Sequence, residues 1–300
     1  MDIKDFSGAG TAVALGMFDG VHTGHKAVFE RAESFEKDGL KAAVFTFNSE
    51  SLADKHGRSY RYILPNSFKL EMIEKSGIEN IYCADFSELR DYEAEDFARI
   101  ILADRMNAKM IVCGNDFRFG RGASGDVNAL KSFGEKYGFG VSTVAHVVTD
   151  GEAVSSSRIR NLLSEGELKK ANALLGYRYK IKQSVSHGNH IGRTIDFPTI
   201  NQSFSEGQLI PAFGVYATEA LIDGKTYSSV TNIGVKPTVE KDCRPLAETH
   251  ILGFSGDLYG RVAEVSFSEY LRGEKKFSSL DELKQQIKTD IKNAEALGGI

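Results

Sequence analysis

Short apolar runs alternate with longer amphipathic stretches along the first half of the 300-residue chain. The runs carry few charges and predict buried strands at Ala12–Leu15, Lys41–Phe47, Ile78–Cys83, Met110–Cys113 and Gly140–Val144. The stretches between them predict helices at Ala27–Lys37, Ser67–Ser76, Ala94–Met106 and Val127–Tyr137. Strands that alternate with helices favour a parallel sheet covered on both faces, which is a doubly wound α/β domain.

The pattern changes beyond about Tyr177, where apolar and polar residues mostly alternate. Asp223-Gly224 separates two strand-like runs, as the turn of a two-residue hairpin does. Several short strands with Gly-rich connections favour an antiparallel β-barrel. We place the linker between Leu174 and Tyr179, which divides the chain into domains 1–176 and 177–300 and gives an α/β plus β fold class.

The chain closes with an amphipathic segment that predicts one terminal helix. Ser279 and Glu282 have the spacing of a capping box, and Gly298-Gly299 ends the segment. Its apolar stripe, which we interpret as packing against the barrel, comprises Leu280, Leu283, Ile287, Ile291 and Ala294.

Composition narrows the class of protein. Three hundred residues favour two domains, and 41% hydrophobic with 26% charged residues is typical of a soluble globular protein. A net charge of −4 offers no basic excess for nucleic acid as the main partner. Three scattered cysteines, Cys83, Cys113 and Cys243, favour a reducing compartment. With no signal-like or membrane-spanning run, we expect a cytoplasmic protein without a membrane partner. The oligomeric state is not determined by these features.

The stretch Gly16–His25 follows the first predicted strand and leads into a helix-like segment. A Gly-rich turn between a strand and a helix brings backbone N–H groups and the positive helix dipole to a phosphate. We therefore assign nucleotide binding to Gly16, Phe18, Asp19, Gly20 and Gly24. His22 and His25 are three residues apart, so they can point two imidazoles at one group. Surface histidines or two metal ligands are the alternatives, although no third Cys, His or carboxylate at typical spacing stands nearby.

The His-x-Gly-His arrangement resembles the signature of the nucleotidyltransferase superfamily, which moves a nucleoside monophosphate from ATP to another phosphate. Two further segments suit such a site. Asp116, in the loop after Met110–Cys113, can hydrogen-bond a sugar hydroxyl or a base, whereas Phe117 and Phe119 suit packing. Ser155, Ser156 and Ser157 open a helix, where they can cap it or bind nucleotide. Arg158 beside them can clamp a leaving pyrophosphate.

A second candidate site lies in Gly188–Asn201. Gly188, Gly192 and Arg193 form a basic loop able to wrap ATP phosphates. Thr199 and Asn201 are two residues apart, so on an extended segment they face the same way. Two neutral oxygen donors suit Mg²⁺ that arrives with the nucleotide. Glu248, on a strand-like run, can serve as a base that takes a hydroxyl proton during phosphoryl transfer. Solvated Thr, Asn and Glu side chains are the alternative at each position.

Across nearly its whole length the chain resembles the bacterial bifunctional riboflavin kinase/FAD synthetase family. The segments that carry the resemblance are Gly16–His25, Gly114–Gly120, Ser155–Arg160, Gly188–Asn201, Thr231–Thr238 and Leu258–Gly260. The resemblance implies that the barrel phosphorylates riboflavin with ATP and Mg²⁺, giving FMN. It also implies that the first domain adenylylates FMN, giving FAD and pyrophosphate. It assigns transition-state stabilisation to His22 and His25, magnesium to Thr199 and Asn201, and the kinase base to Glu248. ATP, riboflavin and FMN are the implied ligands.

The chain departs from the family pattern at several positions. Asn48-Ser49-Glu50-Ser51 stands where a Glu-Pro-His-Pro run often lines the flavin side of the adenylyl site. Ser157 replaces a usual Thr, Gln183 and Asp196 each replace a Gly, and Ile200 replaces an Ala. These departures leave two alternatives, a chain with only one active half and a flavin- or nucleotide-binding protein without turnover.

Overall fold

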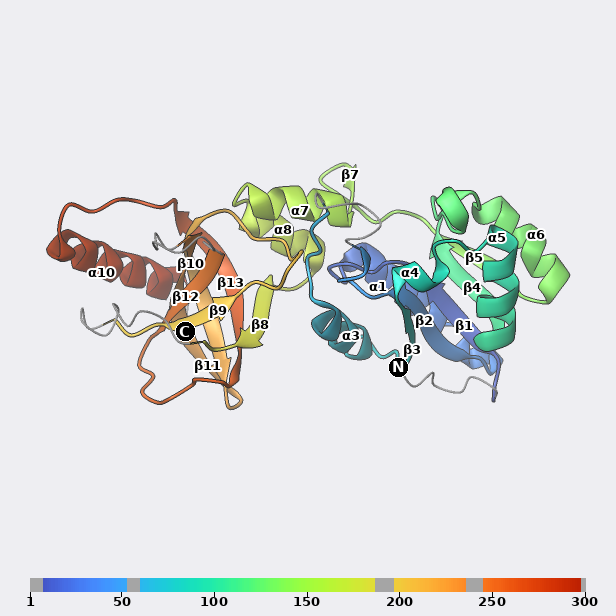
Figure 1. Ribbon diagram of the computed structural model, residues 1–300, viewed down its shortest axis with the longest axis horizontal. Coiled ribbons are helices and arrows are strands. Elements are labelled where there is room, and N and C mark those ends of the chain that lie inside the picture. Colours follow the sequence, from blue (N-terminus) through green and yellow to red (C-terminus); the bar gives the residue numbers. More distant parts are fainter. Residues whose placement is uncertain (1–7, 53–59, 187–196, 236–244, 298–300) are drawn as a thin grey trace. The chain divides into compact units, whose positions relative to one another are not determined.

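The computed structural model describes residues 8–52, 60–186, 197–235 and 245–297. The chain forms two compact units, residues 1–156 and 157–300 (Figure 1). The stretch 157–176 is grouped with the second unit, whereas the sequence analysis places it in the first domain. The boundary at 176 stays a prediction.

The first unit contains a five-stranded parallel sheet with the strand order β3-β2-β1-β4-β5. Its elements are β1 (Thr11–Leu15), α1 (Thr23–Glu33), η1 (Glu36–Asp38), β2 (Lys41–Phe47), α3 (Asn66–Glu74), β3 (Asn80–Ala84), α4 (Phe86–Leu89), α5 (Ala94–Asp96), η3 (Phe97–Arg105), β4 (Ala108–Gly114), η4 (Arg121–Ala123), α6 (Val127–Tyr137), β5 (Gly140–Val144), β6 (Val148–Thr149) and β7 (Glu152–Ala153). The five predicted strands of the sheet are confirmed, with shifts of up to two residues at β1, β3 and β4.

Helices pack on both faces of this sheet, so the doubly wound prediction is confirmed. Val13 and Leu15 of β1 belong to a core cluster with Phe97 and Ile101 of η3 and Leu130 of α6. Helix α1 packs along β1, β2 and β4 and contributes no residue to that cluster. It begins at Thr23, four residues before the predicted start, because His22 caps it. The predicted helix 94–106 is continuous, but η3 has π-helical hydrogen bonding.

The strand order places a switch point at the centre of the sheet. β1 pairs in parallel with both β2 and β4, and the order runs outward from β1 in one direction and from β4 in the other. Ligands of open α/β sheets bind beyond the carboxyl ends of the strands at such a point. The turn 16–25 follows β1 and the loop 115–120 follows β4, so both predicted nucleotide segments start at this edge.

The second unit contains a six-stranded antiparallel sheet with the order β8-β13-β10-β11-β12-β9. Its elements are α7 (Ser156–Ser164), α8 (Leu168–Leu175), β8 (Lys180–Ser184), β9 (Ile200–Ser203), β10 (Gly214–Ile222), β11 (Lys225–Val235), β12 (Pro245–Ile251), β13 (Val262–Arg272) and α10 (Leu280–Leu297). A bridge from Ser186 to Asn201 connects the two edges, so the sheet is nearly closed and the predicted barrel is confirmed. The hairpin at Asp223-Gly224 joins β10 to β11 as predicted.

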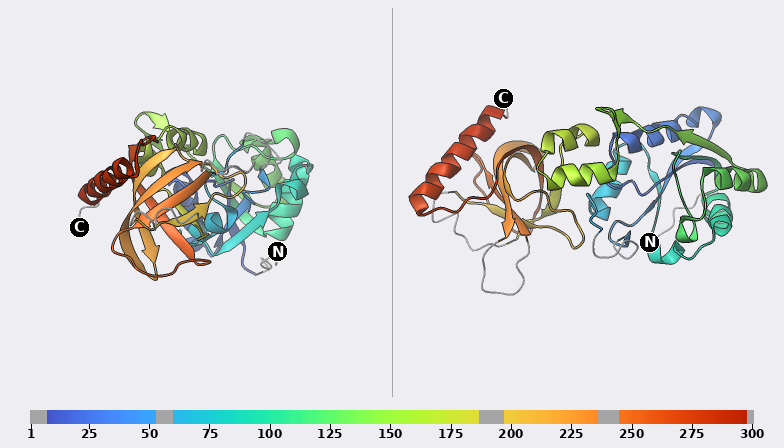
Figure 2. Two further views of the ribbon diagram at one scale, coloured as in Figure 1. Left: turned by 60° about the vertical axis from the view of Figure 1, so that its left-hand side comes forward. Right: turned by 90° about the horizontal axis from the view of Figure 1, so that it is seen from above.

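Helix α10 packs against the outside of β10, β11 and β13 (Figure 2). Ala294 and Ile291 lie against Val215 and Val230, which confirms the packing role of the stripe. Leu280 is 61% exposed, because it is the first residue of the helix and precedes the part that contacts the barrel. Half of the capping box forms as predicted. Ser279 Oγ accepts from the Glu282 N–H at 3.2 Å, whereas the Glu282 carboxylate accepts from Ser278.

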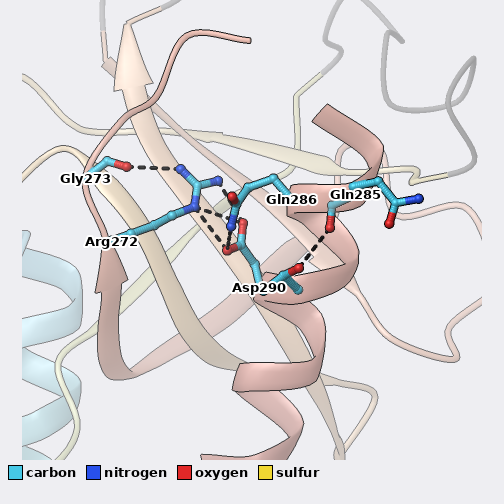
Figure 3. Close-up of polar contacts among 6 residues, drawn as sticks. Arg272, Gly273, Gln285, Gln286 and Asp290 are labelled. Carbon is cyan, nitrogen blue, oxygen red and sulfur yellow. Dashed lines mark hydrogen bonds and ion pairs between the residues drawn. The ribbon is translucent and has the colours of Figure 1, made fainter. Parts of the chain in front are cut away.

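An ion pair fastens α10 to the last strand of the barrel (Figure 3). Arg272 Nη2 lies 2.7 Å from Asp290 Oδ2, and Arg272 Nε lies 3.0 Å from Asp290 Oδ1. Gln286 donates a further hydrogen bond of 2.9 Å to Asp290 Oδ1. The Asp290 side chain is 4% exposed, so this carboxylate is nearly removed from water and its charge is balanced by Arg272.

Candidate functional sites

The two predicted histidines meet at the beginning of α1. His22 is the N-cap residue, and its Nδ1 accepts a hydrogen bond of 3.3 Å from the His25 backbone N–H. Their rings are stacked with centroids 3.5 Å apart and planes 20° apart. The prediction that both imidazoles share one face is therefore confirmed, beside the free N–H groups of a helix N-terminus.

The turn that leads to these histidines has a strained backbone. Phe18 and Val21 have φ angles of 51° and 39°, which side chains other than Gly rarely adopt. Phe18 is 1% exposed and packs edge-on against His25 at 5.2 Å between ring centroids. A Cβ at Gly16 would lie 2.7 Å from the Phe18 ring, and one at Gly24 would lie 3.2 Å from His22. These glycines are needed so that the aromatic rings can pack closely under the turn.

His25 has a buried nitrogen that is ready for a ligand. Its Nδ1 is buried and has no hydrogen-bond partner among the described residues. Burial lowers the pKa of His25 well below its usual value, and the nearby His22 and Lys69 lower it further. The ring is therefore neutral at pH 7. An unsatisfied buried polar atom in a native fold calls for an explanation, and a bound ligand supplies one here.

Asp19 is buried, and its carboxylate is used to hold the protein backbone. Its Oδ1 accepts hydrogen bonds from the N–H groups of Ile63 at 2.8 Å and Leu64 at 3.3 Å. Ser156 Oγ donates to the Asp19 carbonyl at 2.8 Å, which ties the start of α7 to the turn. Nucleotide binding by Asp19, Ser156 and Gly20, which has a φ of 83°, stays a prediction.

Lys69 of α3 was not predicted from the sequence. It is 0% exposed, and its ammonium donates to the carbonyl of Phe47 at the end of β2. Burial lowers its pKa, whereas nearby Cys83, Asp19 and Glu50 raise it. The available signal was its place four residues before the buried Ile73, on the apolar face of a helix. A buried cation beside the predicted phosphate turn favours anion binding there.

A cavity of about 500 Å³ opens at the carboxyl ends of β4 and β5. Its polar lining includes Asn115, Asp116, Arg118, Lys131 and Thr143. Phe119 is buried in the core and Phe117 packs against it, which confirms their predicted packing roles. Asp116 thus lies in a cavity at the switch-point edge, where the sequence analysis expects a nucleotide.

The remaining predicted residues of this site lie around the start of α7. Ser155 comes directly before the helix, and Ser157 and Arg158 are in its first turn. Arg160 donates a hydrogen bond of 3.1 Å to Ser157 Oγ. The nucleotide and pyrophosphate roles of Ser155, Ser157 and Arg158 stay predictions.

In the barrel, the strand register brings Asn201 and Glu248 together. Asn201 in β9 is directly opposite Glu248 in β12, and Thr199 comes just before β9. Directly opposite residues on neighbouring strands lie on the same face with Cβ atoms about 4.5–5.5 Å apart. Amide, hydroxyl and carboxylate oxygens thus gather at one place, and such donors suit Mg²⁺. Gly188, Gly192, Arg193 and Asp196 lie outside the described residues.

His250 is another residue to which the sequence analysis assigned no role. Its Nδ1 is 2.8 Å from the carbonyl oxygen of Pro198, which can only accept, so Nδ1 carries the proton. Its ring also packs edge-on against Phe197 at 5.4 Å between centroids. His250 therefore fixes the segment that presents Thr199. The signal was its position two residues beyond Glu248, on the same face of an alternating strand.

Comparison with known proteins assigns each unit. The FAD synthetase family profile matches residues 6–158, and the riboflavin kinase family profile matches residues 175–297. The bifunctional riboflavin kinase/FMN adenylyltransferase of Escherichia coli K12 is 35% identical and covers 97% of this chain and 94% of its own length. That of Listeria monocytogenes is 33% identical, covering 95% and 91%. The chain belongs to the bifunctional riboflavin kinase/FMN adenylyltransferase family.

The solved structures also contain a full-length relative of this family member. A Streptococcus pneumoniae crystal structure, described as a macrolide-efflux protein, is 31% identical with a TM-score of 0.84, and the match covers 98% of this chain and 97% of that one. Within the part of the chain that the structure describes, no helix has both the length and the apolar character to cross a membrane.

The departures from the family pattern are accommodated by local hydrogen bonds. The Ser49 N–H donates to Asn66 Oδ1 at 3.3 Å, and the Asn66 N–H donates to Glu50 Oε1 at 3.0 Å. Segment 48–51 of this adenylyltransferase unit is therefore held to the start of α3. In the kinase unit, Gln183 Nε2 donates to Ser205 Oγ at 3.0 Å. Glycine could not make that bond.

Proposed function

We propose that this chain makes FMN and FAD in two separate sites. The second unit phosphorylates riboflavin with ATP, and the first transfers AMP from a second ATP to FMN with release of pyrophosphate. The observation that carries this proposal is the presence in one chain of two phosphate-directed arrangements. These are the stacked His22 and His25 at a helix N-terminus and the Asn201–Glu248 pair on the barrel.

Adenylyl transfer needs no protein nucleophile, because a phosphate oxygen of FMN attacks the α-phosphorus of ATP and the bond to pyrophosphate breaks. Positioning and charge stabilisation are the tasks left to the protein. His22, His25 and the N–H groups at the start of α1 stabilise the charge that develops around the α-phosphate. Gly16, Phe18, Asp19, Gly20 and Gly24 shape the turn around the nucleotide. Asp116 and Ser155–Ser157 hold ATP, and Arg158 holds the leaving pyrophosphate.

In the kinase, Glu248 accepts the proton of the riboflavin hydroxyl as that oxygen bonds to the γ-phosphorus and ADP leaves. Thr199 and Asn201 offer the oxygen donors that fit Mg²⁺, and they would hold the ion that ATP brings. When bound, Mg²⁺ neutralises charge on the phosphates. Gly188, Gly192 and Arg193 wrap those phosphates. We infer a cytoplasmic enzyme whose partners are ATP, riboflavin and FMN, with neither nucleic acid nor membrane as a partner.

One assay tests the whole proposal. Purified protein is incubated with riboflavin, ATP and Mg²⁺, and in parallel with FMN, ATP and Mg²⁺, and the flavins are separated by chromatography. Both FMN and FAD should form from riboflavin. Formation of FMN alone would select a chain whose adenylyl half is inactive because of Asn48–Ser51. FAD from supplied FMN alone would select an inactive kinase, and no turnover would leave a binding protein.

A further inference from the structure

Three polar side chains lie in a row across the outer face of the barrel. Asn232 of β11 is directly opposite Glu248 of β12, and Glu248 is directly opposite Asn201 of β9. The adjacent Thr231 and Thr249 are 0% exposed and share a hydrogen bond of 2.9 Å inside the barrel. Because side chains alternate along a strand, the row faces outward. The sequence analysis gave Asn232 no role.

A second carboxylate approaches Asn232 from the segment after β13. A Cβ placed at Gly234 would collide with Glu274 Oε1 and would lie 3.6 Å from Asn232 Nδ2. The amide nitrogen and the Glu274 carboxylate therefore both lie within 4 Å of one point. The absence of a side chain at Gly234 allows this approach. Asn232 is thus next to two carboxylates, Glu248 across the strand pair and Glu274 beyond Gly234.

The Asn232 amide is available to bond a neighbour. Its side chain is half-buried and makes no hydrogen bond within the described part of the chain. Like charges near one another favour protonation of one carboxylate, which would remove a general base. A neutral amide donor stabilises the charged form without forming an ion pair that would weaken the base.

We propose that Asn232 is a positioning residue of the kinase site, whose amide orients the Glu248 carboxylate and separates it from Glu274 during phosphoryl transfer. This inference rests on the proposed role of Glu248 as the base. The titratable side chains that face Glu248 here are His250 on its own strand and Glu274 beyond Asn232. Asn201 on the other side is neutral.

The test compares Asn232→Ala, Asn232→Asp and Asn232→Ser with a matched control, Ser228→Ala. Ser228 is on the same strand and the same face, four residues away from Asn232. For each variant, riboflavin phosphorylation is measured as kcat and KM across pH. Adenylylation of supplied FMN by the same polypeptide serves as the internal reference.

Asn232→Ala should lower the kinase kcat about tenfold or more, since a hydrogen bond to a charged group is lost. The acidic limb of its kcat–pH profile should move to higher pH, and Asn232→Asp should move it further because it adds a third carboxylate. Asn232→Ser keeps a donor and should retain most of the activity. Ser228→Ala and all FMN adenylylation rates should stay within about twofold of the unmodified chain.

The inference is overturned if Asn232→Ala keeps its kinase kcat, or if activity falls equally at every pH with an unmoved acidic limb. The second result would mean a purely structural loss. Glu248→Gln separates the two levels of the argument. If that variant is inactive as a kinase while Asn232→Ala is normal, only the role of Asn232 fails. If Glu248→Gln remains fully active, the proposed kinase chemistry itself fails.

Discussion

Replacing Arg272 by Met should destabilise the kinase unit much more than breaking an exposed ion pair of the same length. Arg272 Nη2 lies 2.7 Å from Asp290 Oδ2, with side chains 22% and 4% exposed. Lys169 Nζ also lies 2.7 Å from Glu269 Oε2 in the same unit, with side chains 71% and 24% exposed. The two pairs therefore differ mainly in access to water, and Lys169→Met is a matched control.

The expected magnitudes follow from this difference in burial. Without Arg272, the Asp290 carboxylate keeps the Gln286 donor but loses its counter-charge in a nearly water-free position. Breaking one side of a buried pair costs about 3–5 kcal/mol. Breaking an exposed pair costs about 0–1 kcal/mol, because water screens both charges. A double change, Arg272→Met with Asp290→Leu, should recover part of the loss, since no unpaired charge then remains.

The assay must read the two units separately, because a two-unit chain does not have to unfold in one step. Hydrogen exchange followed by mass spectrometry across a urea series gives a midpoint for peptides from each unit. Arg272→Met should lower the midpoint of peptides from β13 and α10 and leave those from β1 and β4 unchanged. Equal effects of Arg272→Met and Lys169→Met, or a loss below about 1 kcal/mol for Arg272→Met, would refute the reasoning.

Three further predictions concern the two sites. His25→Ala should reduce FAD formation from FMN by about 100-fold or more and leave riboflavin phosphorylation nearly unchanged; equal loss of both would contradict separate sites. Glu248→Gln should reduce FMN formation by about 100-fold or more while FAD still forms from supplied FMN, and normal kinase turnover would remove Glu248 from its role. Because folding lowers the pKa of His25, the unfolded chain binds a proton that the folded chain refuses. The urea midpoint of the first unit should therefore fall as pH drops below about 6.5, and His25→Gln should weaken that dependence; an unchanged slope would contradict a buried neutral ring.

Much of the fold follows from local patterns in the sequence. The run at residues 41–47 forms β2 with the predicted bounds, and 127–137 forms α6 with the predicted bounds. Hydrophobic periodicity succeeds there because burial of one face decides both the type and the length of an element. It was less accurate at 94–106, where the residues are helical but the hydrogen bonding is π. Periodicity does not encode that distinction.

The sequence by itself determined which residues bring chemistry to the two sites and where along the chain each stands. His22, His25, Asn201 and Glu248 could be chosen because a turn after a strand, or alternation along a strand, restricts where their side chains can point. Tertiary structure decided which of them meet. Strand register, set by contacts between distant segments, places Glu248 between Asn201 and Asn232, and long-range packing buries Lys69 beneath the turn. Such contacts depend on how whole elements fill a common core, so no local pattern could show them.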